Sequence, residues 1–261
     1  MTPSSLGAAY AGAVAELHAG IVAANAAAVA AAASAVAGRL AEDRLVFVAG
    51  PGAHSQLAVQ DVFCRPGLPA GLVPVIDRAT LLTEGAFRST AHERRPGRAE
   101  EILAPYGIER HDVVLLVNAS GVNATVIDLA RALQRRGAVV IGYSSVRAEE
   151  AITEGHPARW EPGVSLSRVA DMHVDTLVPP GDTAAVAGVG EVPLATTANA
   201  FALTWTLLEA GAILDAGAVH DAGGLDVGST TAARWASSYR PGGDARNAEL
   251  ALRYRDRVEA L

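Results

Sequence analysis

A chain of 261 residues is long enough for one large α/β domain or two small ones. Half of its residues are apolar and 19% are charged, so a sizeable core is expected and global disorder is excluded. The net charge of −7 argues against a general nucleic-acid binder, whose surface should be basic. The single cysteine, Cys64, excludes an intramolecular disulfide framework.

The first part of the chain, residues 8–38, is rich in alanine and predicts a long helix. Alanine is a weak membrane residue, and three polar residues interrupt the run: Glu16, His18 and Asn25. No Lys or Arg precedes Arg39, so a basic region followed by an apolar one, as in a secretory signal, is missing. We therefore expect residues 1–40 to pack on the rest of the chain or on a dimer partner. We expect no membrane contact and a cytoplasmic location.

Five short apolar segments follow at a spacing typical of alternating strands and helices. They are residues 45–49, 72–76, 112–117, 138–143 and 172–178. Continuous Val, Leu and Ile without alternation is typical of strands covered on both faces. A helix is clearest over residues 124–136, which Gly137 closes. This pattern predicts an α/β fold with a doubly wound parallel sheet.

The connections between these segments differ in length. Residues 77–110 form the longest, and a long polar connection in an α/β domain is often functional. Residues 144–168 read as irregular, 179–182 as a turn, 196–210 as an apolar helix and 215–240 as a loop. Asp244 is expected to cap the N-terminus of a final helix that runs through Val258. Residues 41–261 are expected to form one domain.

Two strand-to-helix loops, residues 50–55 and 118–123, carry the strongest functional signal. Each apolar run breaks into small and hydroxyl-bearing residues where a helix should begin. Free N–H groups at a helix N-terminus, beside small residues that allow close approach, form an anion site. Two such loops on neighbouring strands would converge on one phosphate, which indicates a phosphorylated small molecule. The alternatives are that the first loop is only a tight turn and that the second loop only caps the N-terminus of the following helix.

The composition of the loops narrows the type of site. The first loop is not a dinucleotide fingerprint, because Ser55 stands where the third glycine belongs, and no P-loop ending follows. In the second loop Ser120 offers a hydroxyl, Gly121 permits close approach and the Asn123 amide can donate a hydrogen bond.

The second loop resembles the Ser-x-Ser-Gly-x-Thr phosphate loop of SIS (sugar isomerase) domains, and the first resembles their strand-one loop. More closely, the chain is similar to bacterial SIS proteins that carry a sugar isomerase domain label. The shared residues run from His54-Ser55 through Glu84-Gly85-Ala86, Glu93-Arg94, Ser120-Gly121-Val122-Asn123 and Gly181-Asp182 to Pro241-Gly242-Gly243-Asp244.

This resemblance implies a five-stranded parallel sheet in flavodoxin-like order and a homodimer with its sites near the interface. It implies that the phosphate of a sugar phosphate is held by loop residues, namely Gly52, Ser55, Asn118, Ser120, Gly121 and Asn123. Asn118 and Asn123 replace a Ser and a Thr of the family pattern, and both can still donate hydrogen bonds. Arg88 is expected to add positive charge near the ligand.

The same resemblance suggests catalytic residues. Glu84-Gly85-Ala86 is similar to a segment of muramic acid 6-phosphate etherases whose Glu does proton chemistry, so Glu84 is the candidate base. Its alternative role is a partner for Arg88. The etherases also use a glutamate in the helix after the first loop, where this chain has Gln60 and Asp61, which makes Asp61 a second candidate. His54 is the candidate proton shuttle.

The sequence therefore predicts a sugar-phosphate-binding protein, with aldose–ketose isomerisation through an enediolate as the leading activity. One alternative is a lyase that acts by β-elimination, and another is a non-enzymatic phosphosugar sensor. The histidines show no ligand spacing, so neither a metal nor another cofactor is expected.

Overall fold

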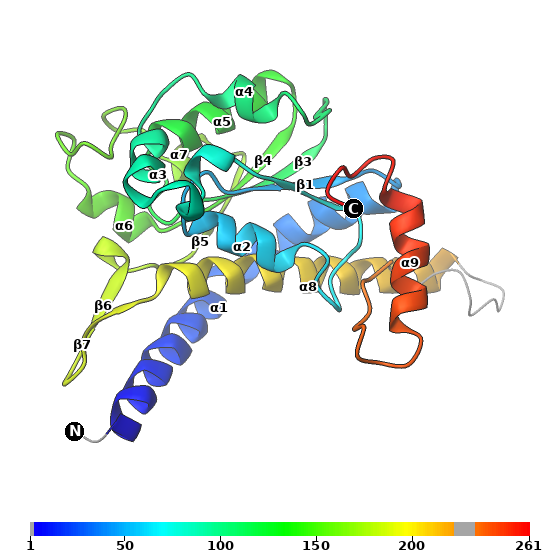
Figure 1. The fold of residues 1–261 in the computed structure, drawn as a ribbon, viewed down its shortest axis with the longest axis horizontal. Coiled ribbons are helices and arrows are strands. Elements are labelled where there is room, and N and C mark those ends of the chain that lie inside the picture. The colour runs from blue at the N-terminus through cyan, green and yellow to red at the C-terminus, as the bar shows by residue number, and fades with distance from the viewer. Residues whose placement is uncertain (1–2, 222–232) are drawn as a thin grey trace.

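A parallel sheet lies at the centre of the computed structural model, which describes residues 3–221 and 233–261 (Figure 1). Its five strands are β1 (Val46–Ala49), β2 (Leu72–Val75), β3 (Val113–Val117), β4 (Val139–Ser144) and β5 (Met172–Asp175). They are ordered β2-β1-β3-β4-β5, and every neighbouring pair is parallel. Each strand coincides with one of the apolar segments, with β4 extending one residue past its segment, so the predicted doubly wound fold with flavodoxin-like order is confirmed.

Helices cover both faces of this sheet. On one face Val46 and Val48 share a core with α1 (Pro3–Ala41), α2 (Ser55–Val62) and α8 (Ala195–Asp221). On the other face Phe47 and Ala49 share a core with α4 (Ala99–Leu103), α5 (Ala124–Arg135), α7 (Leu166–Val169) and α9 (Gly243–Tyr254). Burial on both sides explains why β1, β2 and β3 contain no polar alternation, whereas the edge strand β5 alternates with His173 and Asp175 and is only partly buried.

The long helix α1 is fixed to the sheet by a buried asparagine. The side-chain amide of Asn25 donates to the carbonyl of Asp175 at 2.8 Å, and its oxygen accepts from the Asp175 N–H at 2.8 Å. The Asn25 amide thus satisfies backbone groups at the edge strand β5. Nearer the N-terminus, His18 stacks on Phe201 of α8 with ring centroids 4.2 Å apart. Two of the polar interruptions in the Ala-rich run therefore serve packing.

Within residues 3–221 and 233–261, α1 is the helix that is long and apolar enough, by length and composition alone, to span a membrane. One third of its most apolar 18-residue window is buried inside the protein. Core helices of soluble proteins meet the same criterion, so this property does not assign α1 to a membrane.

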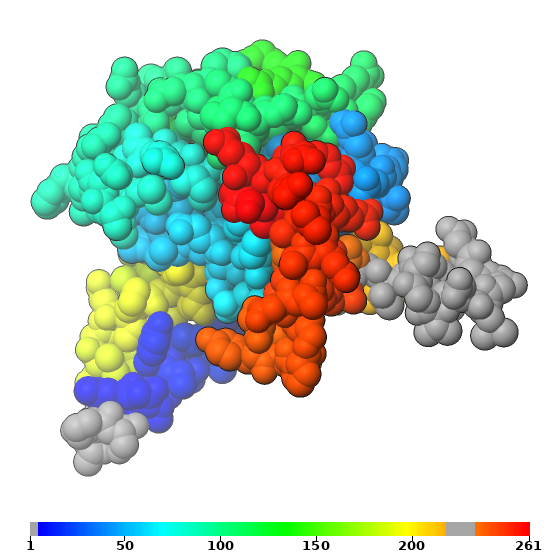
Figure 2. All heavy atoms as spheres, turned by 45° about the vertical axis from the view of Figure 1, so that its right-hand side comes forward, coloured from blue at the N-terminus to red at the C-terminus, as the bar shows by residue number. Residues whose placement is uncertain are grey.

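The connections carry shorter elements. Between β2 and β3 lie η1 (Arg78–Thr80), η2 (Leu82–Glu84), α3 (Ala86–Glu93) and α4, and α6 (Val146–Ala151) follows β4. After β5 come η3 (Pro180–Asp182) and an antiparallel hairpin of β6 (Thr183–Val186) and β7 (Gly190–Pro193). The hairpin lies beside the N-terminal part of α1, and the last helix α9 packs at the opposite end of the molecule (Figures 1 and 2).

Two expectations about the second half of the chain are wrong, and one hairpin was not predicted. Residues 215–221 continue helix α8 instead of starting a loop, and the rest of the predicted loop up to residue 232 lies outside the described residues. The hairpin over residues 183–193 had no counterpart among the predicted strands. Asp244 lies inside the first turn of α9, whose N-cap is Gly242 in the left-handed conformation at φ +80°.

Candidate functional site

The first strand-to-helix loop brings backbone close to two side chains. Gly52 has φ +148°, and a Cβ at this position would lie 3.3 Å from both the Asn118 amide nitrogen and a Glu93 carboxylate oxygen. A larger residue would therefore be strained and crowded, so glycine suits this position. The loop leads directly into α2, whose first residue, Ser55, is buried, while His54 before it is exposed.

The second loop is braced against the first by Asn118. The buried Asn118 amide donates to the Pro51 carbonyl at 3.1 Å, and its oxygen accepts from the Gly121 N–H at 2.8 Å. Gly121 has φ +66°, and a Cβ there would lie 2.8 Å from the Ser144 hydroxyl. Asn118 thus holds the two loops together, which is a structural use of a residue predicted to bind phosphate.

A carboxylate that the sequence interpretation did not select joins both loops. Glu93, the last residue of α3, accepts from the Ala53 N–H of the first loop at 3.2 Å. Its other oxygen accepts from the side-chain amide of Asn123, the N-cap of α5, at 3.0 Å. The amide oxygen of Asn123 is buried and has no hydrogen-bond partner. The available signal was Glu93-Arg94 itself, which belongs to the segments shared with the SIS pattern.

A cleft of about 560 Å³ opens beside this junction, past the carboxyl ends of the strands. It brings together residues from α3, the second loop, the segment after α6 and η3. Its polar lining consists of Thr90, Glu93, Arg94, Ser120, Asn123, Thr153, His156 and Asp182. Of the residues predicted for the site, Ser120 and Asn123 line it directly, and Gly52, Asn118 and Gly121 shape the loops behind it.

Two carboxyl groups in the cleft, those of Glu93 and Asp182, have raised pKa values. Burial raises the pKa of Glu93, the nearby charge of Asp182 adds to this effect, and the Ala53 N–H and Arg94 oppose it. Burial likewise raises the pKa of Asp182, and the charge of His54 acts in the opposite direction. His54 therefore lies close enough to influence a group in the cleft. Carboxyl groups with raised pKa values in a cleft are candidates for a functional role.

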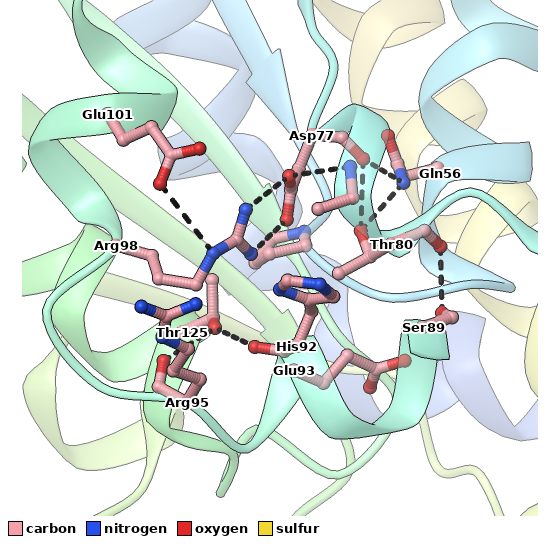
Figure 3. A network of polar contacts seen from close by, with 12 residues as sticks. Gln56, Asp77, Thr80, Ser89, His92, Glu93, Arg95, Arg98, Glu101 and Thr125 are labelled. Atoms are coloured by element: carbon pink, nitrogen blue, oxygen red, sulfur yellow. Dashed lines mark hydrogen bonds and ion pairs between the residues drawn. The ribbon is translucent and has the colours of Figure 1, made fainter. Parts of the chain in front are cut away.

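A buried polar network fixes the connection that carries Glu93 (Figure 3). Arg98 forms two hydrogen bonds with Asp77, at 2.7 and 2.9 Å, and each side chain is 4% exposed. Gln56 of α2 donates to the Asp77 carbonyl at 2.9 Å and to the Thr80 hydroxyl at 2.8 Å. Thr125 of α5 donates to the His92 carbonyl at 2.9 Å. Residues 77–98 are thereby tied to both α2 and α5.

The other candidates lie outside the cleft in the single chain. Glu84 and Arg88 are more than half exposed, and their charged groups are 3.9 Å apart. Asp61 of α2 pairs with Arg65, which lies just past the end of that helix, at 3.1 Å. Gln60 is exposed and its amide donates to the helix carbonyl of Gln56. None of these four side chains is part of the cleft lining, so the catalytic roles of Glu84 and Asp61 stay predictions.

Across the described residues, no group of three or more His, Cys, Asp or Glu side chains has the arrangement of a metal site. The residues of the cleft offer hydroxyl, amide and carboxyl groups, a guanidinium and an imidazole. This set can hold a polar, hydroxylated ligand with an anionic group.

Comparison with known proteins supports the sequence resemblance. A family model described as the SIS domain matches residues 9–145. A UPF0309 protein of Brucella anthropi is 35% identical over 221 residues, which cover 85% of this chain and 84% of that protein. A UPF0309 protein of Brucella canis is 33% identical over 215 residues, 82% of each chain.

Solved structures share the architecture at low sequence identity. A phosphoheptose isomerase from Neisseria gonorrhoeae aligns with a TM-score of 0.53 at 15% identity, covering 81% of this chain and 98% of that one. A phosphoheptose isomerase from Francisella tularensis aligns with a TM-score of 0.51 at 17% identity, covering 80% and 97%. At such identities the likeness concerns the fold.

Proposed function

The chain belongs to the SIS domain family, and on this premise we propose that it binds a sugar phosphate in the cleft and interconverts its aldose and ketose forms. One observation carries the proposal. The second loop, the N-terminus of α5 and buried carboxyl groups meet in one cleft beyond the carboxyl ends of the parallel strands. Ligands of open α/β sheets bind at this edge.

The phosphate is assigned to the second loop. Ser120 offers a hydroxyl in the cleft, and α5, which is 12 residues long, directs its N-terminus and partial positive charge to the same region. Arg94 supplies a full positive charge in the lining. The buried hydroxyl-bearing residue Ser55 starts α2 behind the first loop. The similarity to phosphoheptose isomerases supports the same assignment.

The reaction needs a base that moves one proton between two carbons. A carboxylate removes the proton from C2 of the open-chain aldose and the enediolate forms. The same proton returns to C1, and the hydroxyl proton passes from O2 to O1, which gives the ketose. We keep Glu84 as the proposed base and His54 as the group that assists proton transfer. Because Glu84 is exposed in the single chain, it reaches a cleft only if a second copy presents it.

A homodimer is therefore part of the proposal. Phe87, three residues after Glu84 in the chain, is 95% exposed on α3. A solvent-exposed aromatic side chain beside a predicted catalytic residue is typical of a surface that a partner subunit covers. We infer that a second copy packs on this part of α3 and that the sites lie near the interface.

A non-enzymatic sugar-phosphate sensor is the second candidate. It is favoured by the helix after the first loop, where the non-titrating Gln60 and the paired Asp61 stand in place of glutamates. Such a protein needs the phosphate site but no base.

Proton NMR in D₂O with a panel of sugar phosphates tests the proposal. We expect deuterium at the carbon next to the carbonyl, together with a ketose product. The Glu84→Gln variant should bind the same sugar phosphate and lose turnover, and Glu249→Gln, on the exposed face of α9, is the surface control. An eliminated product indicates a lyase. Line broadening without any exchange favours the sensor, and an active Glu84→Gln variant contradicts the proposed base.

A further inference from the structure

Several hydrogen-bond donors of the predicted phosphate site already have partners within the chain. The Asn118 amide donates to the Pro51 carbonyl, and the Asn123 amide donates to Glu93. The Ala53 N–H of the first loop also donates to Glu93. Each of the two amide nitrogens is therefore held by one acceptor, which fixes its orientation and leaves only its second N–H for a ligand.

The group that accepts from Ala53 and Asn123 is itself an anion. The Glu93 carboxylate lies at the N-cap of α5 and at the loop before α2, where helix N-termini favour one negative group. A phosphate entering the same region meets a like charge at short range. Repulsion between two charges in a partly buried site is strong because water screens it poorly.

The surroundings of Asn123 indicate that its side-chain amide has a second hydrogen-bonding arrangement. Asn123 is 9% exposed and lines the cleft, and its amide oxygen has no hydrogen-bond partner among the described residues. An unpaired buried acceptor is unfavourable. A half-turn of the amide lets its oxygen accept from a protonated Glu93 and frees its nitrogen to donate to a ligand.

We propose that Glu93 determines what this cleft binds: its carboxylate occupies the anion site of the empty protein, and a phosphate group enters only when Glu93 is protonated or has moved aside. Binding an anionic ligand is then coupled to uptake of a proton by Glu93 or to displacement of its side chain. The inference rests on the proposed function, because it concerns the site assigned to the phosphate.

The charged surroundings are compatible with this coupling. Arg94 follows Glu93 in the chain, Asp182 faces it from η3, and His156 lines the cleft from the segment after α6. His54, at the start of α2, acts on Asp182. Burial raises the pKa of Glu93, which brings its protonation closer to neutral pH. His54 and His156 also lie near these carboxyl groups, so a test must compare each variant with the wild type at the same pH.

The test measures sulfate binding by isothermal titration calorimetry with the full chain. Sulfate remains a dianion between about pH 5.5 and about pH 8, so a change in binding over this range comes from the protein and not from the probe. The variants are Glu93→Gln, which keeps the shape of the side chain, and Glu93→Ala, which empties the space. Glu249→Gln on the exposed face of α9 has the same change in net charge and serves as the control. Circular dichroism establishes that each variant is folded.

We expect Glu93→Gln and Glu93→Ala to bind sulfate at least about tenfold more tightly than the wild type at the higher pH, because a like charge has been removed. The gain should shrink at the lower pH, and Glu249→Gln should behave as the wild type. Equal or weaker sulfate binding by both Glu93 variants overturns the inference while leaving an anion site in place. If no variant binds sulfate, inorganic phosphate or any sugar phosphate, the anion site and the proposed function both fail.

Discussion

Replacing Arg98 by methionine should destabilise the protein more than any surface change of the same charge. Arg98 makes two charge-assisted bonds to Asp77, and both side chains are 4% exposed. At these distances the attraction is about 6 kcal/mol for an effective dielectric constant of about 20. Arg98→Met leaves the Asp77 carboxylate buried with only the Ala79 N–H as a partner, for which we expect a loss of about 3–5 kcal/mol.

Urea unfolding followed by circular dichroism measures this loss. The control is Arg88→Met, because Arg88 is exposed and lies 3.9 Å from Glu84, and it should change the unfolding free energy by less than about 0.5 kcal/mol. The double variant Asp77→Asn, Arg98→Met should recover part of the lost unfolding free energy, because no buried charge is then left without a partner. A loss below about 1 kcal/mol for Arg98→Met would refute the view that this pair holds the connection of residues 77–98.

Two further predictions concern the loops of the site. Asn118→Ala removes the side chain that holds the two loops together and leaves the Pro51 carbonyl and the Gly121 N–H unpaired. Urea unfolding should therefore show that the free energy of unfolding falls by about 1–3 kcal/mol. An unchanged free energy of unfolding would contradict this role of Asn118. Burial raises the pKa of Glu93 above its ordinary value of 4.5, so its contribution to stability is fully present below pH 4.5 and is lost as the pH rises through the raised pKa. Thermal melts of the wild type and Glu93→Gln from acid to neutral pH should therefore diverge in favour of the variant as the pH rises; parallel curves would oppose the burial argument.

The fold was predictable because its strands are buried on both faces. Residues 112–117 and 138–143 read as continuous apolar runs, and the structure places β3 and β4 there. The hairpin of β6 and β7 was missed because it lies outside the sheet, has exposed side chains and lacks such a run. Residues 215–221 extend helix α8, and Asp215 pairs with Arg234 at 2.6 Å, a contact between distant parts of the chain that local propensity does not reveal.

The candidate site was only partly predictable for a related reason. The loops of residues 50–55 and 118–123 follow strands of the sheet, so their convergence could be inferred from topology. Glu93 gains its role through partners 40 and 30 residues away, Ala53 and Asn123, and no local pattern specifies those contacts. The hydrogen bond from the Asn118 amide likewise depends on the position of the Pro51 carbonyl in the folded chain.

A crystal structure of the protein soaked with a sugar phosphate identified by the NMR panel tests the central claim most directly. We predict that the phosphate lies against the Ser120 hydroxyl and the N-terminus of α5, with the Asn123 amide nitrogen turned toward it and Glu93 no longer holding that amide. A sugar phosphate bound elsewhere, with the cleft between α3 and the second loop empty, would contradict the assignment of this site.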